Sequence, residues 1–445
     1  MRAVVAGAGM TGLALAHQLA QGGLQVTVLD AQSAGGLSLS QRFHDFVWDR
    51  FYHVILPSDR ELLQLLEELG LGGELVWRRT QQGCWIGDRL CPLNTALDLL
   101  RLPTLPLSAK LRIGWMALRA PRAFEDDRLD SQTSAEWLRA WCGEPGYRDF
   151  WRHLLRAKLG SAAEWVSARF IFATIRRLAS ARKAGGSGDT FGYVRGGYRT
   201  ILGRMLERLA ALGVRVVEGS KVESVRLVRD GVEVDTPAGT FPADTVFLTM
   251  HNPMVAELLP MLPDAERLRL QDTAYLGVAC TVAVGRRPLS ANYILNVVDD
   301  RSCLTGVIET TNVVDASAET NGHALVYLPR YAPTGDPIHR QDDAAIAEAA
   351  LRDLRRIRPA AGGDWLLHQS VQRARFIQPI PRVGAAPVRP PREVVPGKVY
   401  VVNNAQLSAC ILNNSDCVGL ARRAAERFLA RQLGGPHTRR EVLAR

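Results

Sequence analysis

A glycine-rich turn at the start of the chain constrains its fold more than any other feature. The apolar run 3–6 leads into Gly7-Ala8-Gly9-Met10-Thr11-Gly12, a helix with apolar periodicity follows, and a second apolar run, 25–29, ends at Asp30. In a βαβ unit such glycines allow a tight turn, close approach of the backbone to a pyrophosphate, and close packing of helix on strand. The helix N-terminus offers N–H groups to phosphates, and Asp30 can accept hydrogen bonds from a ribose diol. The pattern therefore predicts an adenine-dinucleotide site, with a purely structural turn as the alternative.

The rest of the chain alternates between three kinds of pattern. Helical patterns fill residues 60–185 and end at a linker, Gly185-Gly186-Ser187-Gly188. An α/β pattern resumes to about residue 250, short β-like runs dominate 275–395, and a last strand precedes a last helix. We therefore predict an α/β fold with a discontinuous Rossmann-like domain (1–75, 190–250 and 396–435), a helical insertion (76–189), a β-sheet substrate domain (251–395) and a C-terminal tail (436–445).

Arginine carries the net charge of +10, because only five of the 55 basic residues are lysines. Guanidinium groups bind oxyanions at two points, so the surplus favours an anionic small-molecule substrate, although coding bias would give the same composition. The basic residues are scattered and do not alternate with stacking aromatics, which argues against nucleic acid as a partner. A peripheral membrane contact stays open, and the sequence does not set the oligomeric state.

The cysteines and the apolar runs indicate the compartment. Seven cysteines without a C-x-x-C pair suggest neither a disulfide framework nor a zinc site, so we expect no metal. The chain opens on Met1-Arg2-Ala3 without a leader pattern, and no apolar run approaches about 18 residues. We expect a cytoplasmic protein that is neither secreted nor membrane-spanning.

Three segments together resemble the FAD-dependent superfamily of amine oxidases, protoporphyrinogen oxidase-like proteins, phytoene desaturases and UDP-galactopyranose mutases. The glycine turn with Asp30 continues into Gly35-Gly36-Leu37-Ser38, which is similar to the family's second pyrophosphate-binding glycine pair. The segment 192–198 is similar to the family's G-x-x-x-G-G re-entry motif, and Val222 follows at the place of the valine whose backbone lies against adenine. The segment 399–425 is similar to the last strand and helix, whose N-terminus faces the flavin.

The resemblance implies a Rossmann-like FAD-binding domain interrupted by a helical cap and a β-sheet substrate domain, with FAD as cofactor. It implies Ser415 as the N-cap of the last helix and Asp416 in its first turn. The residues that it assigns to FAD are Gly7, Ala8, Gly9, Met10, Thr11, Gly12, Asp30, Ala31, Gly35, Gly36, Leu37, Val222, Asn403, Asn404, Ser415, Asp416 and Cys417.

The chain departs from the family pattern in three places. The spacing from Asp30 to Gly35 is one residue shorter than usual, and Asn403-Asn404 replaces the usual glycine and acid after the last strand. Neutral amides would then make the ribityl and phosphate contacts. Beside the flavin, Asp49-Arg50-Phe51-Tyr52-His53 replaces D-x-G-G-H. A narrower resemblance, to bacterial proteins labelled protoporphyrinogen oxidase-like or amine oxidase-like, supplies no substrate.

Six residues are candidates for the chemistry, each with a structural alternative. His53 can accept a proton near the flavin, or it can be a structural histidine. Tyr52 could position substrate or simply pack. Lys158 could reach an anionic substrate or lie on a solvated helix face. Glu309 and Asn312 could bind a substrate amine or hydroxyl, or hold a loop.

Arg375 is the sixth candidate. It alternates with Arg373 on an extended segment, so the two could clamp a carboxylate or diphosphate, or lie on the surface. Cys410 and Cys417 lie near the flavin helix, but their context gives little support for a covalent thioether to the flavin.

The sequence thus predicts an FAD-dependent oxidoreductase that dehydrogenates or desaturates a small or medium organic substrate, with oxygen or another acceptor reoxidising the flavin. The helical insertion and the β-layer are expected to close over the flavin. One alternative is a redox-neutral mutase similar to UDP-galactopyranose mutase, in which arginines hold a diphosphate. The other is a scaffold that keeps the fold without catalysis.

Overall fold

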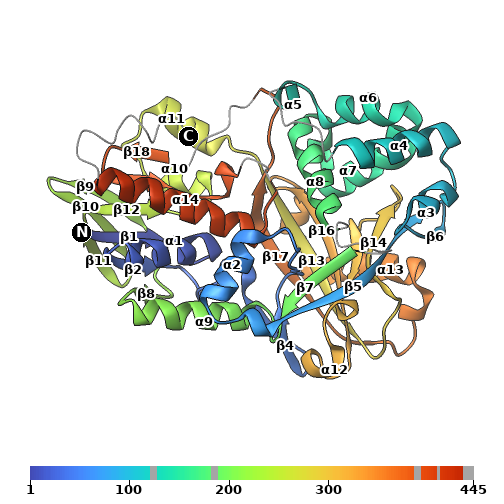
Figure 1. Ribbon diagram of the computed structural model, residues 1–445, viewed down its shortest axis with the longest axis horizontal. Coiled ribbons are helices and arrows are strands. Elements are labelled where there is room, and N and C mark those ends of the chain that lie inside the picture. The colour runs from blue at the N-terminus through green and yellow to red at the C-terminus, as the bar shows by residue number, and fades with distance from the viewer. Residues whose placement is uncertain (121–127, 182–188, 385–391, 408–410, 434–445) are drawn as a thin grey trace.

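Two lobes make up the protein (Figure 1), which we describe from a computed structural model. The structure describes residues 1–120, 128–181, 189–384, 392–407 and 411–433. The predicted tail 436–445, the linker 185–188 and Cys410 lie outside these residues. One lobe holds both ends of the described chain, and the other holds a large sheet with a group of helices above it.

The first lobe is built on a six-stranded sheet of order β18-β19-β12-β1-β2-β8. Its strands are β1 (Arg2–Ala6), β2 (Gln25–Leu29), β8 (Arg215–Val217), β12 (Thr245–Leu248), β18 (Arg392–Val395) and β19 (Val399–Val401). All neighbours are parallel except β18, which runs antiparallel at the edge. Because the strands come from three separate stretches of chain, the predicted interrupted Rossmann-like α/β fold is confirmed.

Helices cover this sheet because their buried faces are rich in Leu and Ala. The helices of the main core are α1 (Met10–Gln21), α2 (Arg60–Glu68), α9 (Tyr198–Ala211) and α14 (Asn414–Leu433). A small sheet of β9 (Ser224–Val228), β10 (Gly231–Thr236) and β11 (Gly239–Ala243) and the helices α10 (Asn252–Leu258) and α11 (Asp264–Gln271) share a second core with strands β1 and β12. The hairpin of β3 (Ser40–Phe43) and β4 (Phe46–Asp49) leads toward the second lobe.

The second lobe is built on an eight-stranded sheet of order β17-β13-β16-β15-β14-β5-β6, with β7 also paired to β5. Its strands are β5 (Leu75–Ile86), β6 (Arg89–Pro92), β7 (Asp189–Val194), β13 (Tyr275–Gly285), β14 (Asn292–Val298), β15 (Gly306–Glu309), β16 (Ala324–Pro333) and β17 (Leu366–Pro379). The helices α12 (Ala316–Glu319) and α13 (Asp343–Ile357) belong to the same part of the chain. Strand β13 is buried along its whole length, so it forms the centre of this lobe.

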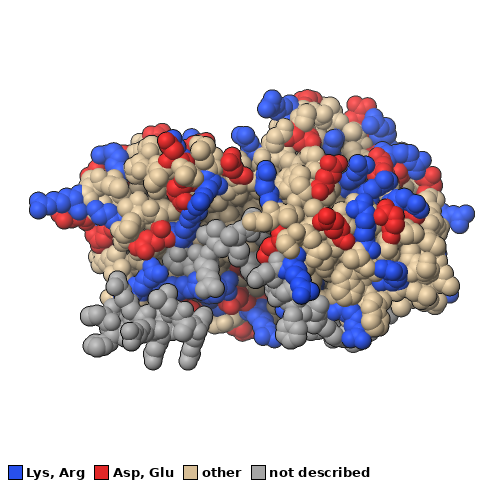
Figure 2. Space-filling model, turned by 90° about the horizontal axis from the view of Figure 1, so that it is seen from above, with Lys and Arg blue, Asp and Glu red and all other residues tan. Residues whose placement is uncertain are grey.

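The helical cap has its own hydrophobic core. It consists of α3 (Ala96–Arg101), α4 (Leu107–Arg119), α5 (Arg128–Ser131), α6 (Ser134–Gly146), α7 (Arg152–Leu159) and α8 (Ala168–Ala181). Within the described ranges no helix is long and apolar enough to cross a membrane. On the face drawn in Figure 2, Lys and Arg side chains are interspersed with Asp and Glu over both lobes and do not gather in one patch.

Four predicted boundaries are wrong. Residues 76–92 are strands of the large sheet and not part of the cap, because β5 pairs with β14 more than 200 residues later. Residues 190–194 pair with β5 as well. The helices within 252–271 and strand β18 pack with the first lobe, not with the β-sheet domain. Pairing partners this distant leave no trace in local periodicity.

A buried ion pair fixes the cap to the first lobe. Arg177 of α8 donates to both carboxylate oxygens of Asp59, at 2.7 and 3.2 Å, and Asp59 also accepts the amide of Leu56 at 2.9 Å. The Asp59 side chain is 4% exposed. Its charge is therefore compensated by Arg177 and not by water.

We predict that Arg177→Met destabilises the protein by about 3 kcal/mol, because it leaves a buried carboxylate without its cation. The midpoint of urea unfolding measures the change. Arg204→Met is the matched control, since the Arg204–Glu207 pair lies on the surface, with both side chains more than half exposed. It should cost less than about 1 kcal/mol. Equal losses in the two variants would contradict the structural role of the Arg177–Asp59 pair.

Candidate active site

The glycine turn forms an open cradle at the N-terminus of α1. A Cβ atom on Gly9 would meet nothing within 4 Å, whereas one on Gly12 would lie 1.8 Å from the Gly7 carbonyl oxygen. Gly12 therefore serves the packing of the helix against the turn, and Gly9 faces free space. The first N–H groups of a helix have no partner within it, so this space can take an anion.

The second glycine pair lies directly beside the first turn. The amide of Gly35 donates to the carbonyl of Ala8 at 2.8 Å, and a Cβ on Gly36 would lie 3.2 Å from the Cα of Gly9. The shortened spacing after Asp30 thus does not separate the two glycine segments. Both loops border the same space, as binding to a pyrophosphate requires.

Asp30 is held at the end of β2 by backbone amides. Its carboxylate accepts the amides of Ala8 at 2.6 Å and Gln32 at 2.8 Å, and Ala31 beside it is exposed. Each oxygen keeps a second lone pair. The predicted ribose contact of Asp30 and the adenine contact of Val222, whose side chain is buried in the second core of the first lobe, stay predictions.

The N-terminus of α14 is capped by Asn413 and not by Ser415, so the predicted N-cap is wrong. The Asn413 side chain accepts the amide of Asp416 at 2.8 Å and donates to its carboxylate at 2.6 Å. Ser415 lies inside the helix, where its hydroxyl accepts the amide of Leu62 at 3.3 Å. Asn at the N-cap satisfies a free helix amide as well as Ser does, and here it precedes the helix directly.

Near this helix end Cys417 is buried and Asp416 is half-buried. Burial raises the pKa of the Cys417 thiol to about 11, with a smaller opposing contribution from a hydrogen bond to Thr11. Burial also raises the pKa of Asp416. Cys417 is therefore a protonated thiol at neutral pH, and an unreactive one.

The amide pair after β19 is used mainly within the protein. Asn403 donates to the carbonyl of Met250 and the side chain of Asn252 and accepts the amide of Ala405. Both N–H groups of the side chain are thereby engaged within the protein, while its Oδ1 keeps a second lone pair, so the predicted cofactor contact of Asn403 stays a prediction. Asn404 donates to the carbonyl of Ile377.

A cavity of about 450 Å³ lies where the first lobe, the cap and the large sheet meet. Most of its wall is apolar, with Trp151, Leu154 and Phe170 from the cap and Val278 and Ile377 from the sheet. Its polar lining residues are Tyr52, His53, Lys158, Thr174, Arg177, Tyr293, Asn296, Thr305, Tyr331, Gln378, Asn413 and Asn414. The cavity is also bordered by Leu37, which follows the second glycine pair, and by Asn413 and Asn414 at the N-terminus of α14. The predicted closure of the cap and the β-layer over this region is therefore confirmed.

A continuous series of contacts crosses this cavity from the cap to the first lobe. Lys158 of α7 has its Nζ 3.3 Å from the ring centroid of Tyr331, and the Tyr331 and Tyr52 hydroxyls lie 2.8 Å apart. His53 follows Tyr52 in the chain, and the centre of its ring lies 4.7 Å from that of Tyr198. The Tyr198 hydroxyl is in turn hydrogen-bonded to the Asn414 side chain. The structure thus brings together three of the six residues predicted for the chemistry.

His53 is held by the first lobe. Its Nδ1 lies 3.7 Å from a carboxylate oxygen of Asp49, is buried, and has no hydrogen-bond partner among the described residues. Asp49 in turn accepts the amide of Tyr198 at 3.0 Å and the hydroxyl of Ser40 at 3.1 Å. A histidine beside a buried carboxylate is well placed to hold a proton.

Lys158 has no acidic partner among the described residues. Burial lowers its pKa to about 7, and no charged group opposes the shift. No Asp or Glu is found among the described residues that line the cavity. Burial raises the pKa of Tyr52 to about 12 and the pKa of Tyr331 well above its usual value, so both stay protonated at neutral pH.

The other predicted candidates do not line the cavity. Glu309 accepts the amide of Leu289 and the hydroxyl of Ser290, and Asn312 donates to the carbonyls of Ser290 and Asn292. Both hold the loop before β14, so their predicted role toward substrate is wrong.

The predicted pair of arginines is also not a clamp. Arg373 binds Asp343 and the carbonyls of Ile338 and Gln341 beside α13. Arg375 lies 5.3 Å over the ring of Phe376. Alternation along β17 predicts that the two side chains lie on one face of the strand. The pairing of β17 with β13 is interrupted by a bulge, and the Asp343 carboxylate binds the guanidinium group of Arg373.

Sequence reasoning missed Tyr331, Arg177, Asn413 and Asn414. The two asparagines directly before the last helix are an N-cap signal that could have found them. Nothing local marks Tyr331 or Arg177, since each enters the cavity wall only through packing of distant segments.

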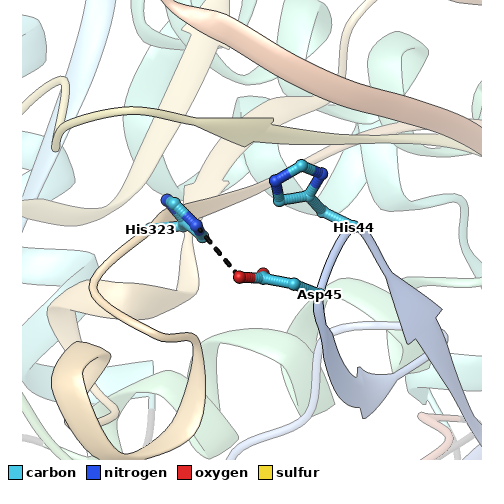
Figure 3. Close-up of side chains that lie close together, drawn as sticks. All are labelled: His44, Asp45 and His323. Carbon is cyan, nitrogen blue, oxygen red and sulfur yellow. Dashed lines mark ion pairs between the residues drawn. The ribbon is translucent and has the colours of Figure 1, made fainter.

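One group of potential metal ligands lies together outside the cavity (Figure 3). His44 and Asp45, in the turn between β3 and β4, and His323, before β16, have ligand atoms that all lie within 4.8 Å of one another. The dashed line marks the contact of His323 with Asp45, at 3.5 Å. None of the three lines the cavity. The expectation of no metal stays a prediction.

Comparison with known proteins identifies the family. A family model described as flavin containing amine oxidoreductase matches residues 10–411. The mitochondrial protoporphyrinogen oxidase of Nicotiana tabacum is 30% identical over 116 residues, which are 25% of this chain and 23% of that protein. The matched segment therefore spans about a quarter of this curated relative.

Solved structures share the fold over nearly the whole chain. Putrescine oxidase bound to putrescine is 17% identical with a TM-score of 0.71, covering 97% of this chain and 99% of the other. Reduced UDP-galactopyranose mutase is 16% identical with a TM-score of 0.72, covering 97% and 96%. At these identities the likeness concerns the fold alone.

We predict that Gly9→Val abolishes retention of a dinucleotide cofactor with little loss of stability in the cofactor-free protein, because its Cβ would enter the cradle without meeting a protein atom within 4 Å. Nucleotide content after denaturation and thermal unfolding of the stripped protein measure the two effects. Gly12→Ala is the contrasting variant. Its methyl group meets the Gly7 carbonyl, so it should lower stability itself. Full cofactor retention by Gly9→Val would show that the cradle is not the binding site.

Proposed function

The chain belongs to the flavin-containing amine oxidoreductases, with FAD as its cofactor, and on this premise we propose that it dehydrogenates a small or medium organic substrate inside the cavity. The observation that carries the proposal is the cavity itself. It is walled by three parts of the protein and bordered by Leu37 after the glycine loops and by the N-terminus of α14. The residues present fit FAD, since the open cradle at Gly9 can take its pyrophosphate and Leu37, directly after the second glycine pair, lines the cavity.

FAD, when bound, accepts the electron pair of a substrate C–H or N–H bond. The protein contributes an enclosure, an orientation and a place for a proton. The apolar side chains of the wall exclude water from the substrate. The hydroxyls of Tyr52 and Tyr331 form a polar pair within this wall and can orient a polar substrate group. Nδ1 of His53 is unpartnered among the described groups and can take a proton, which the Asp49 carboxylate would stabilise.

The charges of the cavity favour a substrate that carries an anionic group. Lys158 is unpaired, whereas Arg177 is engaged with Asp59. A cationic substrate would meet a cation and no free carboxylate in the described wall. A substrate carboxylate beside Lys158 would supply the missing counter-charge and offset the cost of its burial.

The two alternatives have less support. A mutase in which Arg373 and Arg375 hold a diphosphate is not favoured, because Arg373 is engaged by Asp343 at the other side of β17. A scaffold without catalysis would have no use for an enclosed cavity with a half-buried lysine whose pKa is lowered to about 7.

We predict that His53→Gln and Tyr52→Phe bind FAD normally but slow anaerobic reduction of the flavin by substrate. Loss of a general base costs about 10² to 10⁴ in rate, and loss of the Tyr52 hydroxyl should cost less. Stopped-flow absorbance of fully loaded enzyme measures the reduction. His339→Gln is the control, because His339 bonds backbone carbonyls at β16 and does not line the cavity. Unchanged rates in both variants would remove His53 and Tyr52 from the reaction.

We predict that phenylacetate binds the FAD-loaded enzyme and that phenylacetamide binds at least about tenfold more weakly, because only the former pairs with Lys158. The flavin absorbance reports both titrations. Since the free-enzyme pKa of Lys158 is about 7, affinity for phenylacetate should be constant below that pH and fall above it. Among the groups around Lys158, Tyr52, Tyr331, Tyr293 and Cys280 all have raised pKa values and stay protonated near neutral pH.

Lys158→Met tests the role of this lysine, since the variant should lose both the preference for phenylacetate over phenylacetamide and the fall in phenylacetate affinity above pH 7. Arg156→Met, on the exposed side of the same helix, should bind phenylacetate as the wild type does. Equal affinity of Lys158→Met and wild type would overturn the anionic preference and leave the oxidoreductase proposal intact.

A further inference from the structure

Helix α4 carries a row of large apolar side chains that face solvent. Leu107, Leu111, Trp115 and Leu118 are 64, 58, 55 and 62% exposed. At about 100° per residue, these positions fall within an arc of about 80° on the helix. Exposed hydrophobics occur singly on most proteins, whereas four of them on one stripe form a continuous surface.

The opposite side of α4 is apolar as well, and it is already used. Ala109, Ile113 and Met116 are buried in the core of the cap. The exposed stripe is therefore not the side that packs on the protein. A helix that is apolar on both sides needs a second apolar environment.

The neighbouring helix α3 extends this surface. Leu97 and Leu100 are 52 and 40% exposed, and α3 packs beside α4. Figure 1 shows both helices at the outer end of the cap, away from the first lobe. We call the six exposed side chains of α3 and α4 the cap stripe.

Cations flank the cap stripe. Helix α4 contains Lys110, Arg112 and Arg119 and no acid, and α3 ends at Arg101. The Arg119 guanidinium lies 4.5 Å over the Trp115 ring, at the edge of the stripe. The one acid of α3, Asp98, is turned to the helix cap, where it accepts the amides of Asn94 and Thr95.

We propose that the cap stripe docks the protein on an anionic lipid membrane, with α3 and α4 lying in the interface. Leu and Trp on one side of a helix with Lys and Arg beside them is the pattern of interfacial helices. The 13 residues of α4 span about 20 Å, which suits a helix lying on the bilayer. A second copy of this chain fits less well, because a symmetric contact would bring the four cations of each copy together.

The test is co-sedimentation of the FAD-loaded protein with vesicles of phosphatidylcholine containing about 30% phosphatidylglycerol, compared with phosphatidylcholine alone. We expect the protein to sediment with the anionic vesicles and to be released by salt. Leu107→Ser/Leu111→Ser should weaken the partition at least about tenfold. Arg101→Gln/Arg119→Gln should weaken it on anionic vesicles only.

The matched control removes two exposed leucines from the first lobe. Leu268 is 54% and Leu227 41% exposed, so Leu227→Ser/Leu268→Ser should partition as the wild type does. Flavin content and thermal midpoint check that every variant is folded. Absence of binding to anionic vesicles, or equal binding by the Leu107→Ser/Leu111→Ser variant, would overturn the proposal. A dimer in solution that this variant dissociates would overturn it in favour of self-association.

Discussion

The buried carboxylate of Asp49 is the interaction on which the site depends. It accepts the amide that begins α9 and the hydroxyl of Ser40 in the paired strand, while the carbonyl of the same residue accepts the Tyr327 hydroxyl of the large sheet. One residue thus joins the hairpin, the re-entry helix and the second lobe. The chain leaves Asp49 in a fixed direction, which places Tyr52 and His53 on the cavity wall.

The site is assembled at a meeting of three parts, and no single part contains it. The first lobe supplies the glycine cradle and the end of α14, the cap supplies Lys158, and the large sheet supplies Tyr331. The Arg177–Asp59 pair holds the cap in place over the first lobe. A cavity built in this way can change its substrate through the cap and the sheet while the cradle stays the same, which explains how one fold serves the different reactions of its relatives.

The cap presents different chemistry on its inner and outer sides. Helix α7 turns Lys158 and α8 turns Phe170 toward the cavity, while α4 turns leucines and a tryptophan to solvent. The inner side is costly because it places a lysine in an apolar wall without a carboxylate, and the outer side is costly because it exposes apolar area. Neither cost is compensated by the residues that the structure describes, and we take each as a sign of a molecule that binds there.

The sequence by itself determined the elements whose signals are local. The glycine turn, the strand end at Asp30 and long helices such as α1, α9 and α14 follow from turn chemistry and from periods of 3.6 and 2 residues, and these sufficed for the Rossmann-like fold and an adenine-dinucleotide site, while FAD followed from the family resemblance. It also marked Tyr52, His53 and Lys158, which lie in segments with a recognisable pattern.

Only the tertiary structure decided which side chains are free to act. Glu309, Asn312 and Arg373 resembled candidates as much as Lys158 did, but their charges and amides are used by neighbours far away in the chain or on another element. The pairing of β5 with β14 and the meeting of Tyr331 with Lys158 depend on contacts across about 200 residues. Local patterns fix conformation, whereas the partner of a polar group depends on long-range packing, and for that reason the roles of these residues could not be read from the sequence.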